Sequence, residues 1–137
     1  MPENKTYSLE IESDPNNLIT VEEFVNYFSK DLGLDEDKIN GLLLSVTEAT
    51  TNAIIHGNKG DKSKIVTINV SANEHLLTII VHDQGGGFDP SCVPDPTHPD
   101  NLLKDSGRGL YLMRVYMDEL YYNYTPTGTE TILKLNI

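Results

Sequence analysis

Residues 39–56 constrain this chain more than any other segment, because they have the apolar periodicity of a helix and only one full charge, on Glu48. A helix that faces water in so acidic a chain should carry several charged side chains. Positions four residues apart lie about 40° apart around a helix axis, so Glu48, Asn52 and His56 form one ridge. The apolar residues beside this ridge are Ile39, Leu42, Leu43, Leu44, Val46, Ala49, Ala53 and Ile55. A carboxylate among apolar neighbours needs a partner, a metal or a chemical role, so the sequence predicts a functional site on this helix.

The length of 137 residues fits a single domain that covers residues 1–137. A net charge of −11 argues against direct binding of nucleic acid, which depends on Lys and Arg to neutralise phosphates. No segment reaches the length of a membrane span, about 20 consecutive apolar residues, and the first residues lack the apolar stretch of a secretory signal. Cys92 is the only cysteine, so the chain has no internal disulfide. We therefore expect a cytoplasmic protein with neither a membrane nor a nucleic acid as its partner.

Five segments have the apolar pattern of strands and are bounded by turn residues. They are residues 7–11, 65–71, 76–81, 119–124 and 129–137. The segment 76–81 is almost continuously apolar, which is typical of a strand at the centre of a sheet.

Three segments have a helical pattern. Thr20, followed by Glu23 three residues later, is typical of a capping box and predicts the start of the first helix. Asp35 is the expected cap of the second helix, and the third covers residues 107–117. The order of helices and strands predicts an α+β fold, a two-layer sandwich in which three helices cover one face of a mostly antiparallel sheet.

Residues 89–106 precede the third helix, hold four of the seven prolines and show neither a helical nor a strand period. A segment of that length without secondary structure is uncommon in a compact domain and is usually a lid or a binding loop. We therefore expect a lid over a site.

Asp83 follows the apolar strand and is itself followed by Gly85 and Gly87. A carboxylate at the end of a strand can accept a hydrogen bond from an amino group such as that of adenine. Glycines beside it let the backbone approach a flat base closely. Taken alone, an Asp-x-Gly pattern is more often only a turn.

The third helix opens with Gly107, Arg108, Gly109 and Leu110. The free N–H groups and the dipole at a helix N-terminus favour a phosphate, and Arg108 adds a positive charge there. Taken alone, glycines before a helix are common and indicate little.

The side-chain oxygen of Asn52 is a hard ligand that suits Mg²⁺, and Glu48, one turn away, could deprotonate an attacking hydroxyl. An interior Asn also often satisfies backbone groups, and His56 fits the end of a helix better than a ligand position. Only the ordered co-occurrence of these motifs, with Gly128-Thr129-Glu130-Thr131 in the last hairpin, points to one nucleotide site.

Four motifs of this chain resemble the N, G1, G2 and G3 boxes of the GHKL ATPases, which share the Bergerat nucleotide-binding fold. They are Glu48-x-x-x-Asn52-x-x-x-His56-Gly57, Asp83-x-Gly85-x-Gly87-Phe88, Gly107-x-Gly109-Leu110 and Gly128-Thr129. Within that superfamily, the small size and residues 109–120 look most like the bacterial anti-sigma factor serine/threonine kinases. Gly86 departs from the usual pattern by adding a third consecutive glycine to the G1 box.

The resemblance implies a role for each matching residue. Glu48 would be the general base, Asn52 would coordinate the Mg²⁺ that bridges the ATP phosphates, and Asp83 would bind the adenine amino group. The remaining nucleotide contacts would come from Gly85, Gly87, Gly107, Arg108, Gly109, Leu110 and Thr131. Arg108 is the candidate for the catalytic contact with the γ-phosphate, and Lys104 is the reserve.

The implied function is that of an ATP-dependent serine kinase of the anti-sigma factor type. Its partners would be a STAS-type anti-anti-sigma protein, which it phosphorylates, and a sigma factor or other regulator, which it holds; relatives often form homodimers. The alternative is a nucleotide-dependent partner-switching module that regulates a serine phosphatase or another protein by contact, without phosphotransfer. A histidine kinase catalytic domain fits less well, since there is no room for the hairpin that carries a phosphoacceptor histidine. A structural domain with an inactive site is the least favoured interpretation.

Overall fold

A five-stranded antiparallel sheet organises the protein, with the strands in the order β1-β2-β3-β5-β4. The computed structural model describes residues 4–85 and 105–137, without the side chains of residues 105–110. The strands are β1 Lys5–Glu12, β2 Ile65–Ala72, β3 Leu76–His82, β4 Glu119–Thr125 and β5 Gly128–Asn136. The apolar strand β3 lies at the centre, as its composition predicted.

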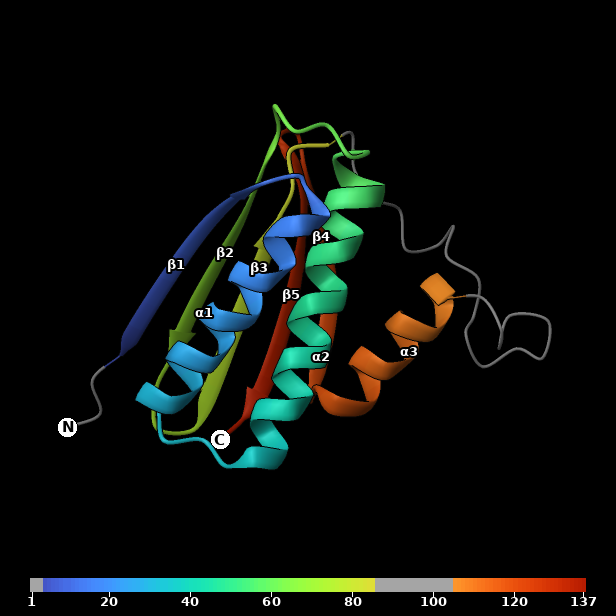
Figure 1. Ribbon diagram of the computed structural model, residues 1–137. Coiled ribbons are helices and arrows are strands. Elements are labelled where there is room, and N and C mark those ends of the chain that lie inside the picture. The colour runs from blue at the N-terminus through green and yellow to red at the C-terminus, as the bar shows by residue number, and fades with distance from the viewer. Residues whose placement is uncertain (1–3, 86–104) are drawn as a thin grey trace.

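Three α-helices lie on one side of this sheet (Figure 1). They are α1 Leu18–Asp31, α2 Glu36–Asn52 and α3 Asp105–Tyr116. A short 3₁₀ turn, η1 Pro15–Asn17, precedes α1, and a π-helix, η2 Ala53–Gly57, continues α2. The prediction of an α+β sandwich with a mostly antiparallel sheet is confirmed. In the part of the chain that the structure describes, no helix is both long and apolar enough to cross a membrane.

The core lies between the helices and the covered face of the sheet. Alternate residues of the strands point to that face, because side chains alternate across a strand; in β2 the buried positions are Val66, Ile68, Val70 and Ala72. The helices contribute their apolar stripes, including the fully buried Phe28 of α1 and Leu42 and Val46 of α2.

The start of α1 differs from the predicted capping box at Thr20. The helix begins at Leu18, directly after the 3₁₀ turn, and Asp14 caps that turn by accepting a hydrogen bond from the Asn16 N–H at 3.0 Å. Pro15 fits the first position of the turn because its φ is already close to helical. The cap of α2 is confirmed, since Asp35 Oδ1 accepts from the Lys38 N–H at 2.9 Å.

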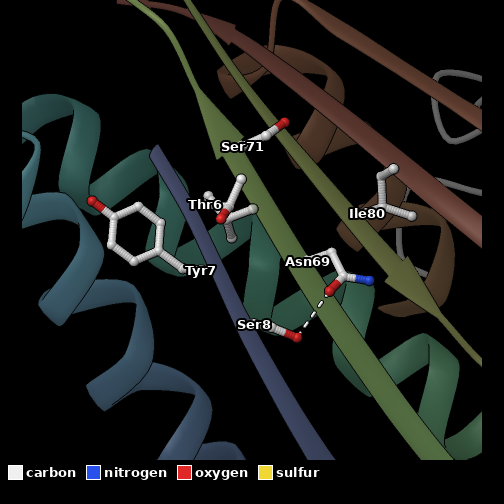
Figure 2. A pocket seen from close by; sticks show the side chains of 7 residues that line it. Thr6, Tyr7, Ser8, Asn69, Ser71 and Ile80 are labelled. Carbon is white, nitrogen blue, oxygen red and sulfur yellow. Dashed lines mark hydrogen bonds between the residues drawn. The ribbon is translucent and has the colours of Figure 1, made fainter. Parts of the chain in front are cut away.

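The opposite face of the sheet is polar at its β1 and β2 edge. Figure 2 shows Ser8 and Asn69 on this face, joined by a hydrogen bond of 2.9 Å, while Tyr7 of the same strand points toward the helices. A shallow hollow of about 370 Å³ lies here and is lined mainly by Thr, Ser and Asn side chains. None of the predicted site residues lines it.

Tyr7 ties the edge strand β1 to α1. Its hydroxyl donates a hydrogen bond to Asp31, which also pairs with Lys5 at 3.5 Å. The hydrogen bond from the Tyr7 hydroxyl is the main cause that holds the pKa of Asp31 below its usual range, and the positive charge of Lys5 is the second. The charged carboxylate therefore stabilises the folded state above about pH 4, and this contribution is lost as the pH falls through the lowered pKa.

We predict that Tyr7→Phe lowers the Tm by about 1–3 °C near neutral pH. Because the lost interaction needs the charged form of Asp31, the difference from wild type should shrink as the pH falls below about 4. Thermal unfolding followed by circular dichroism at several pH values measures both effects. Tyr27→Phe is the control, since Tyr27 packs edge-on against Tyr7 but its side chain is 65% exposed. A pH-independent difference would contradict this role of Tyr7.

Candidate functional site

Backbone N–H groups from two segments hold the carboxylate of Asp83: one from the turn that follows β3 and one from the start of β5. Its side chain is 4% exposed, and Oδ1 accepts hydrogen bonds from the Gly85 N–H at 3.0 Å and the Thr129 N–H at 3.1 Å. The Asp83 N–H in turn donates to the Thr129 carbonyl at 3.0 Å. Among the described residues no donor reaches Oδ2. The two bonds to Oδ1 therefore fix the side chain, while Oδ2 lies against Gly57.

Two glycines make room for this carboxylate. A Cβ on Gly57, at the end of η2, would lie 2.1 Å from Asp83 Oδ2. A Cβ on Gly128, at the start of β5, would lie 1.8 Å from the Asp83 carbonyl oxygen, and Gly128 also has a φ of +144°. Neither position can accept a side chain without displacing Asp83. The structure thus brings the end of the second helix, the end of β3 and the start of β5 to one point, as the motifs predicted.

Thr131 lies on the same face of the sheet as Asp83. It pairs with Val81 in the β3–β5 register, and Asp83 stands two residues farther along. Since side chains alternate, both point toward the helices, and Thr131 is 8% exposed. This position is compatible with the predicted contact of Thr131 with a base bound at Asp83.

Glu48 and Asn52 lie one turn apart on α2 and are both partly buried. Glu48 lines a hollow of about 430 Å³ between α1 and α2, together with Leu43 and Leu44 on its own helix. Glu22 and Asn26 of α1 line it as well. The expected setting of Glu48 among apolar neighbours is therefore only half right. The apolar arc below it is buried, but the outer neighbours are polar, and Ile55 is 48% exposed.

The helix changes its winding directly after Asn52. Residues Ala53–Gly57 form a π-helix, in which the Asn58 N–H donates to the Ala53 carbonyl at 2.8 Å. π-Turns are rare and occur frequently at functional sites. This local widening places Gly57 against Asp83 and buries Asn58, a residue that no motif in the sequence indicated.

Both polar atoms of the Asn58 side-chain amide form hydrogen bonds. The side chain is 1% exposed; Oδ1 accepts from the Gln84 N–H at 2.8 Å, and Nδ2 donates to Ser13 Oγ at 2.8 Å and to the Ile65 carbonyl at 3.2 Å. Its position directly after the His56-Gly57 motif was the only signal in the sequence, because two of its partners, Ser13 and Gln84, lie 45 and 26 residues away along the chain.

The predicted phosphate-binding residues Gly107, Arg108, Gly109 and Leu110 lie in the first turns of α3, where side chains are not described. The C-terminal end of α3 packs on α2, with the Tyr116 ring against Gly41. Figure 1 shows the first turn of α3 standing apart from α2. Gly87, Lys104 and residues 89–104 of the expected lid fall outside the described residues.

The described part of the site fits an adenine nucleotide. A buried carboxylate with one oxygen fixed can accept a hydrogen bond from an amino group, and the glycines allow the close backbone contacts that surround it. The Asn52 amide oxygen is the kind of ligand that Mg²⁺ accepts, with phosphate oxygens and water completing its shell.

Comparison with known proteins assigns the family. Residues 11–135 match the model of the histidine kinase-like ATPase domain. The chain is 40% identical over 95 residues to the serine-protein kinase RsbW of Bacillus licheniformis, and this match covers 65% of the chain but 59% of that kinase. It is 33% identical over 139 residues to the anti-sigma F factor of Clostridium beijerinckii, covering 98% of the chain and 95% of that protein.

A solved structure shares the fold. The crystal structure of the RsbU and RsbW domains of Rv1364c from Mycobacterium tuberculosis superposes with a TM-score of 0.71 at 16% identity. The match covers 96% of this chain and 31% of that one. The family model spans nearly the whole chain, and the shared fold agrees with it. This chain belongs to the histidine kinase-like ATPase family.

Proposed function

We propose that this chain is an ATP-dependent serine kinase of the anti-sigma factor type. Its substrate is a serine of a STAS-type anti-anti-sigma protein, and the same chain holds a sigma factor or another regulator when the substrate is absent. The observation that carries the proposal is the fixed Asp83 carboxylate, packed against the end of the helix that bears Glu48 and Asn52.

Asp83 lies at the end of the nucleotide site that binds the base. Its Oδ2 accepts a hydrogen bond from the adenine amino group, while the Gly85 and Thr129 N–H groups keep the carboxylate in place. A site with a fixed acceptor rejects bases that present an oxygen at that position, because two acceptors then face each other in a buried place. Thr131 of β5 lies on the same face of the sheet as Asp83.

Asn52 holds the Mg²⁺ that accompanies ATP, through its side-chain oxygen. When bound, the ion neutralises charge on the phosphates and orients them. Gly107, Arg108, Gly109 and Leu110 at the start of α3 contact the phosphates through backbone N–H groups and the Arg108 guanidinium. Lys104 is the second candidate for the γ-phosphate.

Glu48 acts on the incoming serine. Its carboxylate accepts the proton of the serine hydroxyl as the hydroxyl oxygen bonds to the γ-phosphorus. The bond between that phosphorus and the oxygen bridging to the β-phosphate breaks, which leaves ADP and a phosphoserine. The hollow beside Glu48 offers a route by which a hydroxyl from another protein reaches it.

The names of the relatives support this assignment. One is a serine-protein kinase, whose match covers 65% of the chain, and another is an anti-sigma F factor, whose match covers 98% of it. The net charge of −11 suits contact with a basic surface of a protein partner.

The first test is phosphotransfer. Wild-type chain, Mg-ATP and a STAS-type protein encoded near it should give phosphoserine on the STAS protein, detected by mass spectrometry. Glu48→Ala should slow transfer by about 10²–10⁴-fold, because the proton acceptor is lost. Its Kd for ATP should stay within about threefold of wild type, since Glu48 acts on the serine rather than on the nucleotide.

Glu22→Ala is the matched control, because Glu22 is the carboxylate that lines the same hollow from α1. Its rate at saturating substrate should stay within about threefold of wild type. Wild-type protein that binds ATP and transfers no phosphate contradicts the kinase proposal. If Glu48→Ala still exerts full control over the regulator, the chain works as a binding switch instead.

The second test concerns the metal. Asn52→Ala should abolish the difference between the Kd for ATP measured with Mg²⁺ and with EDTA, because the protein ligand of the ion is gone. Isothermal titration calorimetry gives both values. Thr51→Ala is the control, since Thr51 only donates to the Thr47 carbonyl at 2.8 Å within the same helix. Equal Mg²⁺ dependence in Asn52→Ala and wild type would show that Asn52 is not the ligand.

A further inference from the structure

Asn58 joins four segments of the chain. Through its side chain it links the end of η2 to Ser13 after β1, to Ile65 at the start of β2 and to Gln84 after β3. Two further bonds reinforce the cluster: Ser13 Oγ donates to the Lys64 carbonyl at 2.8 Å, and the Ile65 N–H donates to Gln84 Oε1 at 2.7 Å. A buried and fully bonded amide of this kind fixes the relative positions of its partners.

The bond from Gln84 bears directly on the nucleotide site. The Gln84 N–H belongs to the peptide unit that leaves Asp83, so Asn58 Oδ1 holds the backbone between Asp83 and Gly85. The next contact is backbone on backbone, because a Cβ on Gly85 would lie 1.6 Å from the Gly57 carbonyl oxygen. The Gly85 N–H then bonds the Asp83 carboxylate. Asn58 therefore supports the group that orients Asp83, without touching the nucleotide itself.

We propose that Asn58 is a positioning residue for base recognition: it locks the Asp83–Gly85 turn onto the end of the helix that carries Asn52. This inference rests on the proposed nucleotide site. Asn52 and Asn58 are separated by the π-turn alone, so Asn58 also sets the spacing between the metal ligand and the base-reading carboxylate. Loss of its Oδ1 leaves the Gln84 N–H unsatisfied and frees the turn.

The test compares ATP with inosine triphosphate, which carries an oxygen where adenine carries its amino group. In wild type, inosine triphosphate should bind at least about tenfold more weakly than ATP. In Asn58→Ala this ratio of Kd values should fall by about fivefold or more, because Asp83 is no longer held in place. Calorimetric titration of both nucleotides into folded protein gives the ratio.

Ser13→Ala is the matched control. Ser13 is fully buried and belongs to the same cluster, but its hydroxyl lies on the side of Asn58 away from Gln84. It should lower the Tm as a lost buried hydrogen bond does and leave the ratio at the wild-type value. A merely structural role for Asn58 predicts the same behaviour for Asn58→Ala, so a folded Asn58→Ala with an unchanged ratio overturns the inference.

A measurement on the wild-type protein covers the case in which Asn58→Ala does not fold. The Gln84 amide should exchange with solvent at least about 100-fold more slowly than the Ser63 amide, which bonds to the exposed Asp61 carboxylate. Similar exchange at both amides overturns the inference. Wild type that fails to bind ATP overturns the proposed function instead, and wild type that binds ATP and inosine triphosphate equally refutes the role of Asp83.

Discussion

The pair of backbone N–H groups that bind the Asp83 carboxylate determines how the rest of the site is built. A carboxylate that is only 4% exposed is costly to bury unless hydrogen-bond donors face it. Gly85 and Thr129 supply those donors, and both must then approach Asp83 closely. This close packing also limits the residues around Asp83, since Gly57 and Gly128 can have no side chain where they contact it.

The second helix connects this carboxylate to the rest of the site. Asn52 ends α2, the π-turn carries the chain onward to Gly57, and Asn58 closes the connection by bonding the turn after Asp83. The geometry between the proposed metal ligand and the base-reading group is thus set by one short stretch of chain. The fold needs this stretch as well, because the same amide joins the ends of β1 and β2. Stability and the proposed nucleotide recognition would therefore depend on the same hydrogen bonds.

The sequence predicted what depends on local pattern. The apolar run of β3, the alternation of β2 and the Asp35 cap are local signals, and each appears in the structure. The motifs around Asn52, Asp83 and Gly128 also identified which distant segments meet. What could not be predicted depends on contacts across the fold. Thr20 does not cap α1, because Asp14 and Pro15 start a 3₁₀ turn before the position at which the capping box would start the helix.

The pattern of the sequence also could not predict the environment of Glu48 or the contacts of Asn58. Periodicity gave the apolar side of α2 correctly, but the polar residues that α1 brings to Glu48 depend on how two helices pack. Asn58 has no distinctive neighbours in the sequence; its three partners come from three different segments.

The most direct test of this account is a crystal structure of the chain with Mg²⁺ and a non-hydrolysable ATP analogue. We expect the adenine amino group within hydrogen-bond distance of Asp83 Oδ2, with Oδ1 still bonded to Gly85 and Thr129, and the metal on the Asn52 side-chain oxygen. A nucleotide bound elsewhere, or a base that does not contact Asp83, would contradict the central claim.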